Sequence, residues 1–144
     1  MISMLHPSNK YTLIEGFDVV DMQVVNTFFS SPEAYWTLKD TDAERHRAWT
    51  ASDSFALLDE QGTMIGGFRF ITDRSFFGYV ADVFILPECR GQHLAEWMLD
   101  TAFTSQEYKS VKRWALRTKD AQGLYKKLGF KLPENQHWEM ELRK

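Results

Sequence analysis

The stretch ILPECRGQHLA, residues 85–95, decides how this chain folds, because the hydrophobic period changes within it. Up to Pro87 the pattern is that of an apolar strand, and beyond Gly91 apolar residues return at helical spacing, at Leu94, Met98 and Ala102. The first turn of a helix has free backbone N–H groups and a partial positive charge, and Arg90 adds a cation. The segment therefore predicts an anion site, although the residues alone also fit a plain strand-to-helix turn with a solvated arginine.

Outward from this stretch, the pattern predicts alternating groups of strands and helices. Three antiparallel strands precede it, and the helix after it leads to a strand and a short helix that Asp120 caps and Gly129 ends. The expected strands are residues 11–15, 54–58, 64–71, 77–86, 111–118 and 138–142, the last from its alternation of apolar and charged residues. Four helices are expected. The first begins after Asp21, its N-cap, and the second spans 40–51 with Trp49 as its main apolar contact. The third spans 91–105, and the fourth runs from Ala121 to Leu128.

The connection from strand 77–86 through helix 91–105 to strand 111–118 is expected to be right-handed, which makes those two strands parallel neighbours. We therefore predict a mixed α/β fold: a mostly antiparallel central sheet with one parallel crossover, flanked by about four helices. A ligand is expected to bind where the two parallel strands meet the helix.

Bulk composition limits the possible functions. A chain of 144 residues suits a single domain over 1–144, and its net charge of −3 with scattered basic residues argues against nucleic acid as a partner. No apolar run is long enough for a membrane helix, and the N-terminus does not have the pattern of a secretory signal. The single Cys89 allows no internal disulfide, which suits the cytoplasm. The four histidines lack metal-ligand spacing, so no metal is expected.

Two motifs resemble those of the GNAT N-acetyltransferase superfamily. PECRGQHLA (87–95) is similar to the family's acetyl-CoA signature, an arginine or glutamine followed by glycines or alanine at fixed spacing, and TKDAQGLYKKLGF (118–130) is similar to its second signature, a tyrosine on a short helix before Gly-Phe. The order of elements matches as well, so the resemblance covers the whole chain. It implies an acetyl-CoA-dependent transfer of an acetyl or other small acyl group to a primary amine of a small molecule or peptide.

The resemblance also implies which residues form the site. The thioester carbonyl is expected to be held by backbone N–H groups at a strand bulge near Val83, Phe84 and Ile85, and the pyrophosphate by Arg90, Gly91, Gln92, His93, Leu94 and Ala95. His93 stands where the family has a glycine. Its side chain either crowds the pyrophosphate, points away from it, or contacts it.

Tyr125 matches the tyrosine that protonates the CoA sulfur in the family, and a phenol is protonated at neutral pH. The alternative is that Tyr125 packs with Leu124 and Leu128 as core. Cys89 has no base beside it, so it is not expected to be a catalytic thiol.

Asp82 lies within an apolar strand, where an unpaired carboxylate is costly. It is expected either to act as base toward an ammonium substrate, where burial would raise its pKa, or to form a structural pair with Arg69 or Arg117. Tyr35 and Trp36, with Trp49, are candidates for the acceptor pocket, or for core.

Two further functions compete with the enzyme. A non-catalytic acyl-CoA-binding or regulatory module is favoured by His93, and a purely structural domain would bind no CoA. The segment 138–142 could be a strand that pairs with a second subunit as a homodimer, or one covered internally.

Overall fold

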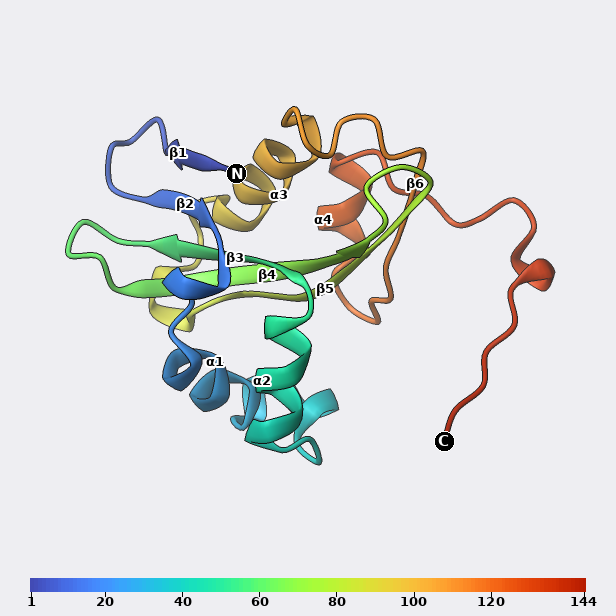
Figure 1. The fold of residues 1–144 in the computed structure, drawn as a ribbon, viewed down its shortest axis with the longest axis horizontal. Coiled ribbons are helices and arrows are strands. Elements are labelled where there is room, and N and C mark those ends of the chain that lie inside the picture. The colour runs from blue at the N-terminus through green and yellow to red at the C-terminus, as the bar shows by residue number, and fades with distance from the viewer.

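The computed structural model describes residues 1–144 as one six-stranded sheet with helices on both faces (Figure 1). The strands, in their order across the sheet, are β1 (Ser3–Leu5), β2 (Thr12–Glu15), β3 (Asp53–Leu58), β4 (Met64–Thr72), β5 (Phe77–Ile85) and β6 (Arg113–Ala115). All neighbours are antiparallel except β5 and β6, which are parallel. The mixed α/β fold with one parallel crossover is confirmed.

Four α-helices and four short 3-10 helices complete the chain. They are η1 (Phe17–Val19), α1 (Met22–Phe29), η2 (Pro32–Thr37), α2 (Asp42–Thr50), η3 (Pro87–Cys89), α3 (Leu94–Thr104), α4 (Gln122–Lys127) and η4 (Gln136–Trp138). Asp21 caps α1 as expected, by accepting a hydrogen bond from the N–H of Gln23. None of the helices is long and apolar enough to cross a membrane.

Two hydrophobic cores fill the spaces between the sheet and its helices, because successive strand side chains point to opposite faces. Phe55 and Leu57 of β3 join α3 in the larger core, whereas Ala56 between them joins α1 and α2 in the smaller one. Trp49 of α2 is fully buried in the smaller core, as its place in the sequence predicts. The sheet therefore separates two helical layers, with α3 and α4 on one face and α1 and α2 on the other (Figure 1).

Four expectations about local structure are wrong. Helix α3 begins at Leu94 instead of residue 91, since Gly91 and His93 have positive φ angles of 83° and 58°, which a helix cannot contain. Strand β6 has three residues instead of eight, since only three pair with β5. Asp120 does not cap α4: the N-cap is Ala121, whose N–H donates to the Thr118 hydroxyl.

The fourth error concerns residues 138–142, which do not form a strand in the sheet. Alternation sorts side chains onto two faces but supplies no partner for the backbone, and no strand pairs with this segment. Strand β1, in contrast, was not expected, because three residues are too few to show a period.

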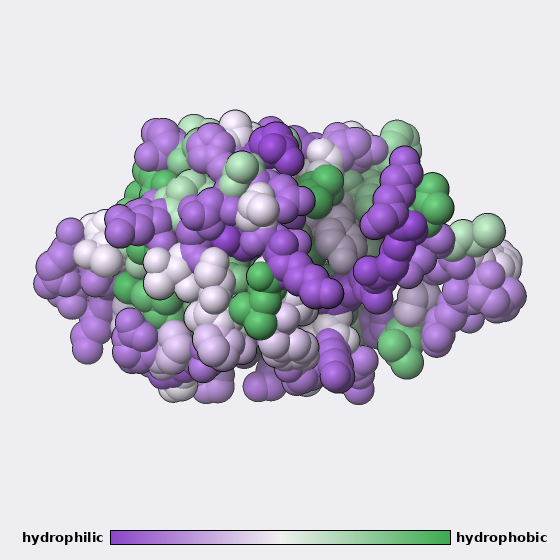
Figure 2. All heavy atoms as spheres, turned by 90° about the horizontal axis from the view of Figure 1, so that it is seen from below, coloured by the Kyte–Doolittle hydropathy of each residue, from purple (hydrophilic) through white to green (hydrophobic).

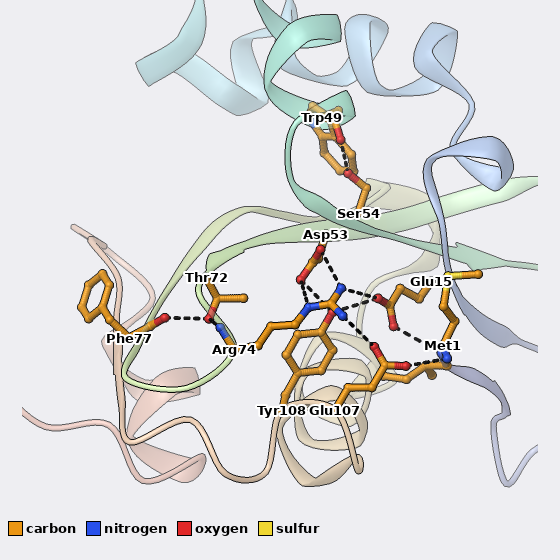
Figure 3. A network of polar contacts seen from close by, with 11 residues as sticks. Met1, Glu15, Trp49, Asp53, Ser54, Thr72, Arg74, Phe77, Glu107 and Tyr108 are labelled. Carbon is orange, nitrogen blue, oxygen red and sulfur yellow. Dashed lines mark hydrogen bonds and ion pairs between the residues drawn. The ribbon is translucent and has the colours of Figure 1, made fainter.

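A polar network borders the larger core where Tyr108 is buried (Figure 3). The Tyr108 hydroxyl lies 2.8 Å from Glu15 Oε2 and 2.9 Å from Asp53 Oδ2, and Arg74 Nη2 lies 2.9 Å from Asp53 Oδ1. Burial and the two carboxylates raise the pKa of the Tyr108 phenol, so it stays protonated. Arg74 is required here to offset the carboxylate of Glu15, which is buried.

Candidate active site

Strand β5 contains a bulge where it passes the middle of β4. Gly67 pairs with Phe84 and Arg69 pairs with Ala81, so two steps along β4 match three along β5. Asp82 has a φ of 55°, the left-handed conformation that an extra residue requires. Val83 and Phe84 then point into opposite cores, and Ile85 joins the larger one. Their side chains are occupied by packing, which leaves the backbone as the part of this segment that a ligand can use.

Asp82 is held at the bulge by an ion pair. Arg69 Nε donates to Asp82 Oδ2 at 2.7 Å, and Arg69 Nη1 donates to the Ser52 hydroxyl at 3.1 Å. Both charged side chains are largely buried, with 16% and 20% of their surface exposed. Of the two expected partners Arg69 is therefore the correct one, since Arg117 pairs with Glu141 instead. Asp82 Oδ1 accepts no hydrogen bond from the protein.

A cavity of about 230 Å³ opens beside Asp82, between the bulge and the layer of α1, η2 and α2. Its lining is Phe29, Thr37, Asp40, Glu44, Arg45, Ala48, Arg69 and Asp82. Arg45 is buried, and its donors are occupied by Asn26, Ser30, Asp42 and the carbonyl of Asp40. Both arginines of the cavity are thus neutralised by protein partners, whereas the carboxylate of Asp40 accepts no hydrogen bond. The cavity suits a cationic group.

Sequence reasoning missed Asp40 and Glu44 as lining residues. The only available signal was the polar character of the segment that forms α2, which a solvated helix explains equally well. Viewed from below, on the side of α1 and α2, the surface is hollowed to the right of its centre (Figure 2).

The loop before α3 presents an uninterrupted run of free backbone donors. The N–H groups of all six residues from Gly91 to Glu96 donate no hydrogen bond within the protein. Three of them belong to the first turn of α3, where the helix dipole adds partial positive charge. Because Gly91 and His93 are left-handed, the chain turns sharply here before the helix starts. This arrangement can bind a phosphate group through the backbone alone.

Side chains of the same loop fasten it to the body of the protein. Arg90 Nε donates to the Ile85 carbonyl at 3.0 Å, and Arg90 Nη1 contacts Glu33 of η2 at 3.0 Å. Gln92 accepts a hydrogen bond from the Tyr11 hydroxyl at 3.1 Å and donates to the Cys89 carbonyl at 3.0 Å. The Arg90 side chain was expected to meet the phosphates. In the structure the side chains of Arg90 and Gln92 hold the loop in position.

The side chain of His93 lies at the surface beside the first turn of α3. Its side chain is 79% exposed, and its Nδ1 lies 3.8 Å from Glu96 Oε2. The left-handed φ at this position is what a glycine adopts readily, and among other residues histidine is one of those that tolerate it best. The His93 side chain makes no hydrogen bond that caps α3, so it does not itself occupy the free N–H groups of the first turn.

A groove of about 460 Å³ continues from this loop between α3 and α4. It is lined by His93, Glu96, Trp97, Asp100, Lys127 and Leu128. Tyr125 lies on α4 and packs against the larger core, with its ring 5.9 Å from that of Phe130. Burial, and to a lesser extent Asp120, raises the pKa of Tyr125 to about 12. Its hydroxyl has no hydrogen-bond partner in the protein, so the proton is available to a ligand.

The remaining candidates lie at the edge of the site or outside it. Tyr35 and Trp36 of η2 are about half exposed, and Lys119 lies 5.9 Å from the Tyr35 ring, but neither aromatic residue lines the cavity at Asp82. Burial raises the pKa of the Cys89 thiol, which keeps it a poor nucleophile. No group of side chains in the chain is arranged to hold a metal ion.

Comparison with known proteins gives consistent results. The model of the acetyltransferase (GNAT) domain family matches residues 46–132. A proposed acetyltransferase of Gibberella zeae is 39% identical over 74 residues, which are 50% of this chain and 42% of that protein. The chain thus spans about two fifths of the length of that curated relative.

Solved structures resemble the whole fold. A proposed GNAT-family acetyltransferase of Xanthomonas campestris is 27% identical, with 93% of each chain covered and a TM-score of 0.86. A proposed acetyltransferase of Deinococcus radiodurans, at 17% identity and a TM-score of 0.72, covers 98% of this chain and 94% of its own, and shares the fold.

Proposed function

Because the chain belongs to the acetyltransferase (GNAT) family, we propose that it transfers an acetyl group from acetyl-CoA directly to a primary amine. The observation that carries the proposal is the run of six unpartnered N–H groups from Gly91 to Glu96, placed at the end of the strand that contains the bulge. CoA carries a pyrophosphate and a thioester on one molecule, so its binding requires an anion site for the first and hydrogen-bond donors at a bulge for the second. One continuous segment of this chain contains both. The acceptor is a small molecule or a peptide, neither nucleic acid nor membrane is a partner, and the reaction takes place in the cytoplasm.

On the donor side, the backbone of the Gly91–Glu96 run binds the pyrophosphate of CoA, and Arg90 and Gln92 keep the loop in place. The thioester carbonyl accepts hydrogen bonds from backbone N–H groups of residues 83–85. Those donors polarise the carbonyl and stabilise the negative charge that develops on its oxygen when the amine attacks.

On the acceptor side, the amine enters the cavity beside Asp82 as an ammonium ion, attracted by the carboxylates of Asp40 and Asp82. Asp82 takes a proton from the ammonium, directly or through water, because only the neutral amine has a lone pair to attack with. Arg69 holds the carboxylate in position. Tyr35 and Trp36, at the rim, contact the part of the acceptor that lies outside the cavity.

In the chemical step a bond forms between the amine nitrogen and the carbonyl carbon, and the carbon–sulfur bond breaks. The departing thiolate takes a proton from Tyr125, whose pKa of about 12 keeps the phenol protonated at neutral pH. The nitrogen loses its second proton to solvent, Tyr125 regains a proton from solvent and Asp82 releases the one it took, so that the products are an amide, CoA and one proton.

A second candidate function is a regulatory module that binds acyl-CoA without turnover. The contact of Arg90 with Glu33 favours it, because that arginine is then not free to neutralise phosphate charge. Release of CoA separates the two candidates.

The test is release of free thiol from acetyl-CoA in the presence of a panel of primary amines, with the acetylated product identified by mass spectrometry. The enzyme is expected to form product, and Tyr125→Phe and Asp82→Asn are each expected to lower kcat by about 10²-fold or more. The control is Tyr79→Phe, at a position of β5 that lies opposite Ala115 of β6. Binding of acetyl-CoA without product from any class of amine would favour the regulatory module.

A further inference from the structure

The cavity beside Asp82 joins a largely buried carboxylate to exposed ones. Asp82 lies at the bulge of β5 with 20% of its side chain exposed, whereas Asp40 and Glu44, from the segment that leads into α2, are exposed. Phe29 and Ala48 add apolar surface to the lining. A ligand in this cavity can therefore have one end at the bulge and the other near solvent, with apolar walls beside it.

The cationic side chains of the lining are already paired within the protein. Arg69 lies 2.7 Å from Asp82, and Arg45 lies 2.6 Å from Asp42. Thr37, a further polar residue of the lining, donates its hydroxyl to a backbone carbonyl at 2.8 Å. A carboxylate or a phosphate on the acceptor would have to compete with these partners, and burying it without one is costly. The lining therefore disfavours amino acids and sugar phosphates as acceptors.

Two carboxylates of the lining have no cationic partner. The ion pairs of the cavity leave out Asp40 and Glu44. Glu44 accepts a hydrogen bond from the Thr41 N–H at 2.9 Å, which lowers the pKa of the Glu44 carboxyl and keeps it ionised at neutral pH. Because Asp82 and Asp42 offset the two arginines, Asp40 and Glu44 give the cavity an excess of two negative charges.

We propose that the acceptor is a short aliphatic diamine, and that Asp40 and Glu44 select it by binding its second ammonium group. The inference rests on the proposed function, in which the first ammonium group gives a proton to Asp82 and is acetylated. A dication balances the two excess negative charges, and its methylene chain contacts Phe29 and Ala48.

The size of the cavity fits an acceptor of this class. Its volume of about 230 Å³ corresponds to about seven water molecules, at about 30 Å³ each. Pentane-1,5-diamine has a similar size, with five methylene groups between its two nitrogen atoms. This volume lies below the about 300–1,000 Å³ of sites for drug-sized ligands, which also favours a small acceptor.

The test compares three amines of equal chain length as acceptors in the thiol-release assay. Pentane-1,5-diamine has a second cation, pentan-1-amine has an uncharged end, and 5-aminopentanoate has an anion there. We expect kcat/KM to be about 10-fold higher for the diamine than for pentan-1-amine, because each of two exposed charge pairs raises affinity by a factor of about 1.4 to 5. The amino acid is expected to be the poorest acceptor. High salt is expected to reduce the preference for the diamine.

The double variant Asp40→Asn with Glu44→Gln removes both charges. It keeps the capping box of α2, because glutamine serves at that position as glutamate does. We expect it to lower the ratio of kcat/KM between the diamine and pentan-1-amine by about 5-fold or more. The control is Asp18→Asn with Glu60→Gln, an equal change at exposed positions outside the cavity, which is expected to keep the native ratio.

The outcomes separate the acceptor class from the reaction itself. Equal kcat/KM for the diamine and pentan-1-amine, or a ratio that the double variant does not lower, would overturn the diamine class and leave acetyl transfer in place. Product from a lysine peptide alone would do the same. Absence of product from every amine, with acetyl-CoA bound, would overturn acetyl transfer and the diamine class with it.

Discussion

Gly66 of β4 lies against the bulge, and its replacement by alanine tests whether the bulge binds the acyl group. A Cβ added there would lie 2.7 Å from the Phe84 carbonyl oxygen and 2.7 Å from Ile85 Cδ1. Real Cβ atoms essentially never come so close, and because the Phe84 oxygen belongs to the backbone, β4 and β5 must move apart. Overpacking of this kind costs about 1–3 kcal/mol of stability.

The same movement displaces the backbone donors of residues 83–85 from the thioester carbonyl. One hydrogen bond is worth about 0.5–1.5 kcal/mol, so Gly66→Ala is expected to weaken acetyl-CoA binding about 2- to 10-fold. CoA has no acyl group, so its affinity is expected to stay unchanged. Calorimetric titration with both ligands measures the difference.

The control is Leu13→Val, a fully buried residue of β2 that loses one methylene and about 1 kcal/mol of stability without touching the bulge. It is expected to bind both ligands as the native chain does. If Gly66→Ala bound acetyl-CoA with native affinity, or weakened both ligands equally, the bulge would not be the acyl site.

Three further predictions concern stability. Arg69→Met leaves the largely buried Asp82 without its partner and is expected to lower the free energy of unfolding in urea by about 1–2 kcal/mol. Arg113→Met breaks an exposed ion pair and is expected to change that free energy by less than about 0.5 kcal/mol. Equal effects of the two variants would contradict the larger contribution of the buried pair. Thr41→Ala removes the N-cap of the capping box on α2 and is expected to lower the free energy of unfolding by about 1 kcal/mol. Thr50→Ala, at the exposed end of the same helix, is expected to change it little. Thermal denaturation that ranked the two variants in the opposite order would contradict this prediction. The pKa of Tyr125 is raised in the folded state, so the contribution of its ionisation to the free energy of unfolding is complete below pH 10 and is lost as pH rises toward 12. Tyr125→Phe is therefore expected to lose less stability between pH 9 and pH 12 than the native chain, and the remaining loss comes in part from Tyr108, whose pKa is also raised. If stability fell equally with pH in both proteins, Tyr125 would not contribute to the pH dependence.

The features predictable from the sequence are those that lie close together in it. The change of period at Gly91 locates the strand, the turn and α3 correctly to within three residues, and the N-cap at Asp21 is a local hydrogen bond. The parallel neighbours β5 and β6 follow from the handedness of the crossover, which is a general rule. The sequence also names candidate residues for the site, and their roles rest on the family resemblance.

What could not be predicted depends on contacts between distant parts of the chain. Whether Asp82 pairs with Arg69 or Arg117 is decided by strand register, and the contact of Arg90 with Glu33 joins residues 57 apart. The cavity lining at Asp40 arises because η2 and α2 lie over the bulge, which no local pattern indicates. Residues 138–142 have the pattern of a strand and no partner, so pattern alone gave the wrong structure there.

The most direct test of the proposed function is calorimetric titration of acetyl-CoA into Ala95→Pro, with Ala95→Ser as the matched variant. The Ala95 N–H has no partner in the protein and lies in the first turn of α3, where proline is tolerated, so the change removes a ligand donor and no internal bond. We predict micromolar binding by the native chain and Ala95→Ser, and binding at least 10-fold weaker by Ala95→Pro, since a hydrogen bond to a charged group is worth about 1.5–3 kcal/mol. Absence of binding by the native chain, or equal binding by the two variants, would contradict the account.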